Sequence, residues 1–338
     1  MEDHTTALVD LSSVISQQLL VDLLVGGTPR AYAEFFEITQ VLKKDEKINE
    51  KEQLEKLKVS LSIIEITKCT GYSVKLFEAM SEVATIFEKA GDFHKSIFYY
   101  SNGLDIAERS GVDIQKAQVK FSLGKVYSIL KSYVLAIQCF EEYIRLSFSN
   151  KNDEGIKEGA NHLLQIYIKC ADDAEQKNRL EESIQYHLKC IESASIGDND
   201  KVVALTGHKI GLLHFRMHQP LISLEYQMKY LNICKLECDK VGESKAHTAL
   251  AQIFESLGQV KEAIDHLEAL LDVAKLMDRT TEARAYCRLG MIYAQHSQLD
   301  YAATYFERYY TTAWAMKDAK MLASAAINLG LTTCALPS

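Results

Sequence analysis

Residues 123–140 read LGKVYSILKSYVLAIQCF, and residues 289–306 read LGMIYAQHSQLDYAATYF. Each segment has a glycine in second place, followed by a tyrosine three residues later, an alanine twelve residues later and a phenylalanine sixteen residues later. Agreement at a fixed spacing in segments far apart in the chain indicates an internal repeat, and an internal repeat decides the fold class before any other feature does.

The same pattern recurs along most of the chain. We number it from the glycine as position 0, so that positions 0 and +12 hold small residues and positions +3 and +16 hold large ones. Position 0 falls at Ala84, Gly124, Leu164, Gly211, Ala251, Gly290 and Gly330, and the copy at Leu164 fits least well. The successive separations are 40, 40, 47, 40, 39 and 40 residues. A small residue lets a second helix cross close by, so the pattern predicts packed helical hairpins.

This pattern resembles the tetratricopeptide repeat, in a form of about 40 residues rather than the usual one of about 34. The resemblance implies an all-α fold, a right-handed superhelical solenoid of helix-turn-helix repeats. We expect residues 71–338 to form six hairpins and a C-terminal capping helix. Residues 1–70 are expected to form an N-terminal helical segment with a charged linker, in which Thr28 caps a helix that begins at Pro29.

The interval of 47 residues between Leu164 and Gly211 has two interpretations. Seven extra residues correspond to about two helical turns, so both helices of this hairpin can be longer without changing which faces are apolar. The alternative is a projecting loop. The segment 169–177, KCADDAEQK, contains neither glycine nor proline, which favours longer helices.

The composition excludes several classes of function. Lysine and arginine number 38 against 46 aspartates and glutamates, and the net charge of −8 argues against a nucleic-acid partner. There is no run of about 18 apolar residues that would predict a membrane span, and no basic segment leading into an apolar one that would predict a signal peptide. The eight cysteines are scattered without a CxxC pair, so we expect free thiols in a reducing compartment.

Motifs for catalysis or cofactor binding are missing from the sequence. The chain lacks GxGxxG, GxxxxGK[ST], HExxH and GxSxG segments, so we expect no enzymatic activity, no cofactor and no small-molecule substrate. His214 and His218 have the i, i+4 spacing of two metal ligands, but His214 stands at position +3, where packing is the simpler interpretation. Cys234 and Cys238 have the same spacing and are interpreted as buried thiols. We therefore expect no metal site.

A superhelix of hairpins presents a concave surface formed by its first helices. Positions −6, −3, +1, +4 and +5 are expected to line it, and in the C-terminal half they hold apolar residues whose exposure would mark a surface for a protein partner. The residues proposed to bind this partner are Leu205, His208, Leu212, Phe215, Arg216, Gln252, Arg284, Met291, Ile327 and Leu331. The two arginines are expected to meet carboxylates at the rim. The alternative is that the tail at 336–338, or the N-terminal helices, fold into the groove.

Two known uses of this scaffold leave recognisable side chains on that surface. Chaperone-binding repeats carry a Lys/Asn clamp for a C-terminal carboxylate, but here positions −3 and +1 hold other pairs, such as Ser81 with Thr85 and Phe121 with Lys125. The 40-residue repeats of spindle-orientation adaptors and kinesin light chains usually carry asparagine at position −2, which is kept here only at Asn328. Both uses are therefore disfavoured.

The chain as a whole resembles a family of ciliary and flagellar axonemal tetratricopeptide repeat proteins. The resemblance begins at residues 20–24 and 31–36, continues through the long third hairpin, and extends over 249–254 and 258–264. It implies a non-enzymatic structural protein of the motile cilium or flagellum axoneme, bound to dynein-arm-associated subunits and located in the cytoplasm and cytoskeleton. Two alternatives remain open: a soluble peptide-binding adaptor of the spindle-orientation or kinesin-light-chain type, and a cytoplasmic assembly factor for dyneins.

Overall fold

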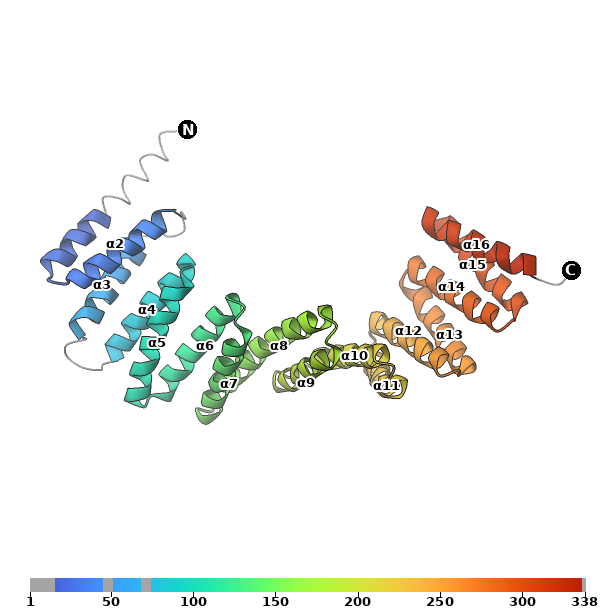
Figure 1. Cartoon of the computed structure of the whole chain (residues 1–338), viewed down its shortest axis with the longest axis horizontal. Helices are drawn as coiled ribbons and strands as arrows, with labels where there is room; N and C mark the ends of the chain where they lie inside the picture. Colours follow the sequence, from blue (N-terminus) through green and yellow to red (C-terminus); the bar gives the residue numbers. More distant parts are fainter. Residues whose placement is uncertain (1–15, 45–50, 68–73, 336–338) are drawn as a thin grey trace, which may run out of the picture. The chain divides into compact units, whose positions relative to one another are not determined.

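The computed structural model describes residues 16–44, 51–67 and 74–335, and the regular secondary structure of these residues is helical throughout. Residues 16–25 form the first described helix. The helices that follow (Figure 1) are α2 (Pro29–Lys44), α3 (Lys51–Thr67), α4 (Val74–Ala90), α5 (Phe93–Ser110), α6 (Asp113–Ile129), α7 (Tyr133–Ser149), α8 (Asp153–Gln176), α9 (Leu180–Ile196), α10 (Asp200–Arg216), α11 (Pro220–Leu236), α12 (Lys240–Ser256), α13 (Val260–Met277), α14 (Arg279–Gln295), α15 (Leu299–Met316) and α16 (Ala319–Ala335). The predicted all-α fold of tetratricopeptide hairpins is confirmed.

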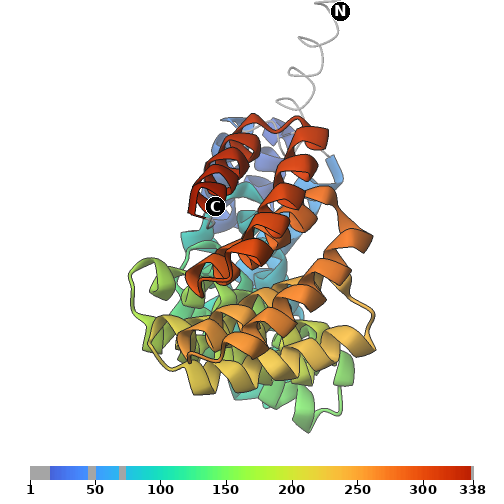
Figure 2. The same cartoon turned by 90° about the vertical axis from the view of Figure 1, so that its right-hand side faces the viewer.

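The chain divides into two compact units, residues 1–166 and residues 167–338, and the boundary lies within α8. In the N-terminal unit one core extends from the helix at 16–25 to α7, and Leu23, Phe35 and Val83 are almost fully buried in it. In the C-terminal unit the helices pack in chain order, so that α15 lies between α14 and α16 (Figures 1 and 2). The predicted domain boundary after residue 70 falls within residues 68–73, outside the described residues, and stays a proposal.

Position 0 lies where the two helices of a hairpin cross, as the repeat pattern predicts. A Cβ atom on Gly124 would lie 2.8 Å from the ring of Phe140, and one on Gly290 would lie 2.6 Å from the ring of Phe306. In the five hairpins that keep the predicted register, the residues at position +12 are all alanine or serine with 0% exposure: Ser96, Ala136, Ser223, Ala263 and Ala302. Because the ring at position +16 fills the space of a side chain at position 0, these two hairpins need glycine there.

The turn between the two helices has the same backbone geometry in six hairpins. The residue at the turn has a positive φ, between 56° and 83°, and the next amide donates to the carbonyl five residues before it over 2.9–3.0 Å. These turn residues are Gly91, Lys131, Asn178, His218, Gly258 and Ser297. Since only two of them are glycine, helix packing rather than glycine's conformational freedom determines the turn. Five of the six stand at position +7 of the predicted register, and Asn178 does not.

The third hairpin differs from the prediction in its register. α8 has 24 residues and α9 has 17, so the seven extra residues lie in the first helix alone, neither in both helices nor in a loop. The Ser183 hydroxyl donates to the Ala171 carbonyl at 3.0 Å, as the Ser223 hydroxyl does to Gly211 at 2.7 Å. Position 0 of this hairpin is therefore Ala171, and the assignment to Leu164 is wrong for the pairing of α8 with α9.

Leu164 keeps the predicted register toward the preceding helix. A Cβ atom on Gly155 would lie 3.0 Å from the Tyr143 hydroxyl of α7, and one on Gly242 would lie 3.0 Å from the Tyr230 hydroxyl of α11. Gly155 precedes Leu164 by nine residues, and Gly242 precedes position 0 of its own hairpin by nine. α8 thus packs against α7 in one register and pairs with α9 in another, two turns further along the helix.

Helix α2 begins at Pro29, as predicted, and the Thr28 carbonyl accepts a hydrogen bond from the Tyr32 amide at 3.0 Å, but the Thr28 side chain does not cap the helix. The Thr28 hydroxyl donates to a preceding carbonyl at 3.0 Å. Instead, the Glu65 carboxylate of α3 accepts the backbone amides of Arg30 and Ala31 at 3.2 and 2.8 Å. A carboxylate satisfies these amides and interacts favourably with the positive end of the helix dipole. The cap therefore comes from another helix, which the local sequence could not show.

Candidate functional site

The residues proposed to bind a partner lie on α10, α12 and α14, the first helices of three hairpins in the C-terminal unit, and on α16, the last described helix. The side chains of Leu205, Leu212, Arg216, Gln252, Arg284, Met291, Ile327 and Leu331 are exposed, that of Phe215 is half-buried, and that of His208 is buried. The exposed fractions of Met291, Ile327 and Leu331 are 48%, 61% and 69%. We call Leu205, Leu212, Met291, Ile327 and Leu331 the first-helix row, because they occupy positions −6, −3 and +1 of these helices. Their binding to a partner stays a proposal.

His208 is corrected from a surface residue to a core residue. Its exposure is 7%, its Nδ1 lies 2.6 Å from Oε1 of Gln227, and its ring stacks on Tyr230 with centroids 4.6 Å apart. Gln227 stands at position +16, where it packs on Gly211, and its buried amide needs hydrogen-bond partners. The His208 ring and carbonyl meet that need, and burial lowers the pKa of His208. His208 therefore packs between the two helices of the hairpin and does not lie on the surface proposed for a partner.

Arg216 is exposed as predicted, but its charge is already paired with Glu175 of α8. The same kind of ion pair joins other neighbouring first helices: Arg288 of α14 lies 3.3 Å from Glu255 of α12, and Lys125 of α6 lies 3.8 Å from Glu88 of α4. The glutamate stands at position +4 in each case, counted from Ala171 for Glu175. Arg216 thus has an ion-pair partner within the chain, and the expectation that Arg216 and Arg284 meet a partner's carboxylates stays a proposal.

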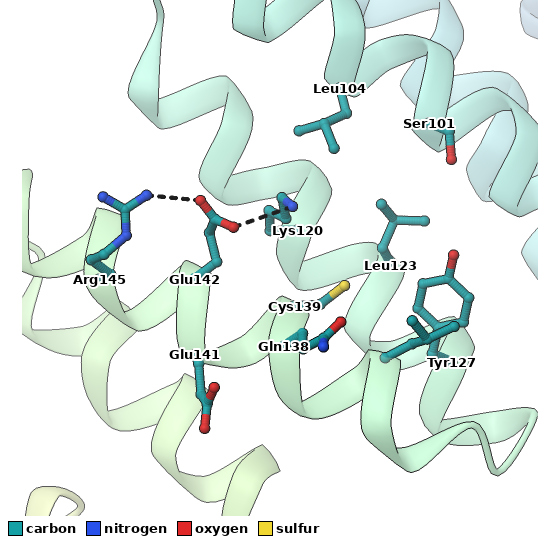
Figure 3. Close-up of a pocket in the computed structure, with 11 residues that line it drawn as sticks. Ser101, Leu104, Lys120, Leu123, Tyr127, Gln138, Cys139, Glu141, Glu142 and Arg145 are labelled. Carbon is teal, nitrogen blue, oxygen red and sulfur yellow. Dashed lines mark hydrogen bonds and ion pairs between the residues drawn. The ribbon is translucent and has the colours of Figure 1, made fainter.

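A pocket of about 620 Å³ opens in the N-terminal unit between α5, α6 and α7 (Figure 3). Its lining is Ser101, Leu104, Lys120, Leu123, Tyr127, Leu135, Gln138, Cys139, Glu141, Glu142 and Arg145. Glu142 lies between two cations, 3.3 Å from Lys120 and 2.7 Å from Arg145, and chiefly the Arg145 hydrogen bond holds the pKa of Glu142 below its ordinary value. Two acids balance two bases, so the lining has no net charge that would select an ion. The sequence analysis missed this pocket, since these common residues come from three helices and form no motif.

The thiols of the core have the properties of packing residues. Burial raises the pKa of Cys139, Cys234 and Cys287, and it raises the pKa of Cys190 to about 12. A reactive cysteine needs a thiolate near neutral pH, which these surroundings disfavour. Cys238 is exposed at a turn, so its predicted burial is wrong, whereas Cys234 is buried as expected.

The two histidines with metal-ligand spacing have other roles in the structure. His214 stacks on Tyr226 with centroids 5.9 Å apart, and its Nδ1 lies 2.7 Å from Oε1 of Gln219, while His218 forms the left-handed turn. Within residues 16–44, 51–67 and 74–335, no group of three or more His, Cys, Asp or Glu could hold a metal ion. Nor is any helix in those ranges long and apolar enough to cross a membrane.

Comparisons with known proteins agree on the repeat. A family model described as tetratricopeptide repeat matches residues 117–150 and 244–275. The chain is 22% identical over 280 residues to tetratricopeptide repeat protein 29 of Trypanosoma brucei brucei, covering 82% of this chain and 58% of that protein. The human protein of the same name is 21% identical over 257 residues, covering 74% of this chain and 54% of that protein. The resemblance to these proteins is confirmed, and the chain spans little more than half of their length.

Solved structures with similar helical arrays include proteins of other kinds. A signal-transduction ATPase with a tetratricopeptide repeat sensor from Pyrococcus horikoshii has a TM-score of 0.46 at 18% identity, covering 87% of this chain and 48% of that one. The C-terminal part of a repeat-containing protein from Cytophaga hutchinsonii has a TM-score of 0.46 at 11% identity, covering 86% of this chain and 98% of that one.

Proposed function

We propose that this tetratricopeptide repeat chain, similar to tetratricopeptide repeat protein 29, is a non-enzymatic scaffold of the motile cilium or flagellum. In this proposal it binds dynein-arm-associated subunits of the axoneme and supports motility. A role in protein–protein interaction follows from the repeats, which stack into extended binding surfaces. The axonemal location and the dynein partners rest on the resemblance alone.

The observation that carries the protein-binding part of the proposal is the line of exposed residues at position +1 of α10, α12, α14 and α16. Leu212, Gln252, Met291 and Leu331 stand there, and all four are exposed. Leu212, Met291 and Leu331 are 37%, 48% and 69% exposed, so each leaves apolar surface that a partner could cover. Covering one fully contributes about 1.5–3 kcal/mol. A partner segment with apolar side chains and a carboxylate for Arg284 fits this line.

The direct test replaces two exposed members of the row by charges. We expect the double variant Leu212→Glu, Met291→Glu to keep the melting temperature of the parent, since both side chains are exposed, and to be lost from isolated axonemes. The matched control is Val134→Glu, Leu221→Glu, which adds the same charges to exposed residues of α7 and α11. Retention of the first variant in axonemes, or loss of the control, would remove the row from the binding surface.

Extraction of demembranated cilia with high salt separates the proposal from its alternatives. An axonemal scaffold stays with the microtubules, and we expect the tagged parent chain in that fraction. A peptide-binding adaptor of the spindle-orientation or kinesin-light-chain type would wash out with the soluble fraction. An assembly factor for dyneins would be found in the cell body and not in the cilium.

A further inference from the structure

An aromatic stack joins the two helices of most hairpins at fixed repeat positions. A ring at position +15 of the second helix lies on a ring at position +3 of the first helix, with centroids 5.3–5.9 Å apart and planes 6–14° from parallel. The four pairs are Phe87 with Tyr99, His214 with Tyr226, Phe254 with His266, and Tyr293 with Tyr305. In the third hairpin, Tyr186 at position +15 counted from Ala171 stacks on Tyr167 with centroids 6.5 Å apart.

The second hairpin, formed by α6 and α7, lacks this stack. Position +3 holds Tyr127, but position +15 holds Cys139, whose side chain is much smaller than a ring. Tyr127 is half-buried and has no ring partner among the described residues. Both residues line the pocket of about 620 Å³ between α5, α6 and α7 (Figure 3). The pocket thus opens where the other hairpins hold the second ring of the stack.

The lining of this pocket suits an uncharged ring. Three leucines contribute apolar surface: Leu104, Leu123 and Leu135. Glu142 is paired with Lys120 and Arg145. These three charged side chains lie on the opposite side of the pocket from Tyr127 (Figure 3). Because the charges pair within the chain, a ligand next to Tyr127 meets a ring face and leucine side chains, and a ring face attracts a second ring by stacking.

Apolar surface continues from the pocket onto its rim. Leu135 of α7 lines the pocket and is 45% exposed. Phe98 of α5 stands three residues before Ser101, which also lines the pocket, and Phe98 is 59% exposed. Residues three apart lie on the same face of a helix, so Phe98 adjoins the pocket. Exposed apolar groups beside a pocket mark a protein-interaction surface, which fits an occupant that is part of a polypeptide.

We propose that the pocket between α5, α6 and α7 binds a tyrosine side chain of a partner protein, which stacks on Tyr127. Tyrosine is the ring that the chain itself uses at position +15 in four of the five stacked hairpins, as Tyr99, Tyr186, Tyr226 and Tyr305. Tyrosines are also frequent anchors of protein interfaces. The pocket lies in the N-terminal unit and shares no residue with the first-helix row, so this site goes beyond the proposed function and does not depend on it.

A second copy of this chain is a poor source of the ring. Among the described residues, Tyr301 is the only exposed tyrosine. Its ring already stacks on Tyr293, with centroids 5.4 Å apart. Moving Tyr301 into the pocket of a second copy would break one stack to form another, which gains little. A partner protein with an accessible tyrosine does not incur this loss.

The first test titrates N-acetyl-tyrosinamide into the full chain and follows the leucine methyl groups by NMR. We expect saturable ring-current shifts at the three leucines of the pocket and none at Leu221, which is exposed on α11. The cyclohexylalanine analogue is apolar but cannot stack, and it should bind about two- to tenfold more weakly. Absence of the shifts at the pocket leucines, or equal binding of the analogue, would overturn the proposal.

A variant that restores the missing ring should close the pocket. Cys139→Tyr should keep the melting temperature of the parent and abolish the shifts, because the new ring stacks on Tyr127 as Tyr305 does on Tyr293. Val134→Tyr is the matched control, since it adds the same side chain to an exposed residue of α7 outside the lining, and it should bind the probe like the parent. If Cys139→Tyr unfolds, Tyr127→Leu replaces it, with binding expected to weaken about two- to tenfold. Unchanged binding in the folded variant would contradict the stack on Tyr127.

The second test identifies the source of the ring. A photo-crosslinking residue in place of Gln138, which is exposed and lines the pocket, is introduced in cells that express the chain. We expect attachment at or next to a tyrosine of another protein, and its loss in Cys139→Tyr. Attachment only to this protein, at Tyr72 or in a second copy, or no attachment at all, would overturn the assignment to a partner. Met291→Glu alters the first-helix row and should leave probe binding unchanged, which separates this proposal from the proposed function.

Discussion

Gly290 and Gly330 occupy the same repeat position, forty residues apart, in opposite surroundings. A Cβ atom on Gly290 would lie 2.6 Å from Phe306, whereas one on Gly330 would meet nothing within 4 Å. Both glycines weaken their helices by about 1 kcal/mol relative to alanine. Only at Gly290 does ring packing within the described chain offset that loss. A glycine in the repeat pattern thus predicts a close crossing, and the crossing exists only where a second helix is present.

The largest effect is expected from removing the ring that closes the crossing at Gly290. Phe306 is 3% exposed, so Phe306→Ala should destabilise the C-terminal unit by about 3–5 kcal/mol through lost contacts and a cavity. Phe148→Ala is the matched control: its ring is 76% exposed, and we expect a change within about 0.5 kcal/mol. Urea denaturation followed by circular dichroism measures both. Equal losses would mean that Phe306 does not close the crossing.

The next effect comes from overfilling the same crossing. Gly290→Leu should cost about 1–3 kcal/mol, since the new side chain and Phe306 compete for one space. The loss of cooperativity should spread to the neighbouring hairpins, because repeats stabilise each other through their interfaces. Gly330→Leu places the same side chain in open space and should leave the melting temperature unchanged. If both variants melt alike, the comparison between the two glycines is wrong.

In the third hairpin, a polar ring fills the space where the two helices cross. His187 stands at position +16 counted from Ala171, is 1% exposed, and neither ring nitrogen has a hydrogen-bond partner. Burial, and next the charge of Lys209, lower the pKa of His187 below its ordinary value. The folded chain therefore keeps the ring neutral, whereas the unfolded chain binds a proton below about pH 6.5. The free energy of unfolding therefore falls as the pH falls below about 6.5, and above that pH His187 causes no such loss.

We expect His187→Leu to stabilise the chain by about 1–2 kcal/mol at pH 7.5, because it removes an unpaired buried polar group. Leu267 occupies the same position beside Ala251, which shows that leucine fits next to alanine there. The advantage of the variant should widen at pH 5.5, where the parent loses stability. Denaturation curves at the two pH values test this, with His94→Leu at an exposed site as the control. A difference that does not change with pH would contradict the assignment.

The smallest effect has opposite signs at the two glycines. Gly330→Ala should stabilise α16 by about 0.5–1 kcal/mol, because alanine is the better helix former and its methyl group meets no atom. Gly290→Ala should destabilise, since a methyl group there must displace the ring of Phe306. Urea midpoints of the two variants, measured side by side, test the signs. Two changes of the same sign would contradict the prediction that Phe306 covers Gly290 while no described residue covers Gly330.

Some of the candidate site could be predicted from the sequence because exposure follows helical position. Positions −6 and +1 point away from the second helix, so Leu205, Leu212 and Met291 are exposed as expected. Position −3 borders the second helix, and its burial depends on the residue at +16. His208 is buried because Gln227, nineteen residues later, needs a hydrogen-bond partner. Such a dependence lies outside any local pattern.

By itself, the sequence determined the repeat, the hairpins and the place where most of them cross. Small and large residues recur at a fixed spacing because every hairpin packs its two helices in the same way. Tertiary structure alone decided the register of the third hairpin. Leu164 and Ala171 are two helical turns apart and lie on the same side of α8, so periodicity could not choose between them. Only the Ser183 hydroxyl on the Ala171 carbonyl, a contact between two helices, made the choice. The exposure of Gly330 was decided in the same way, because whether a glycine is covered depends on the presence of a second helix and not on the glycine.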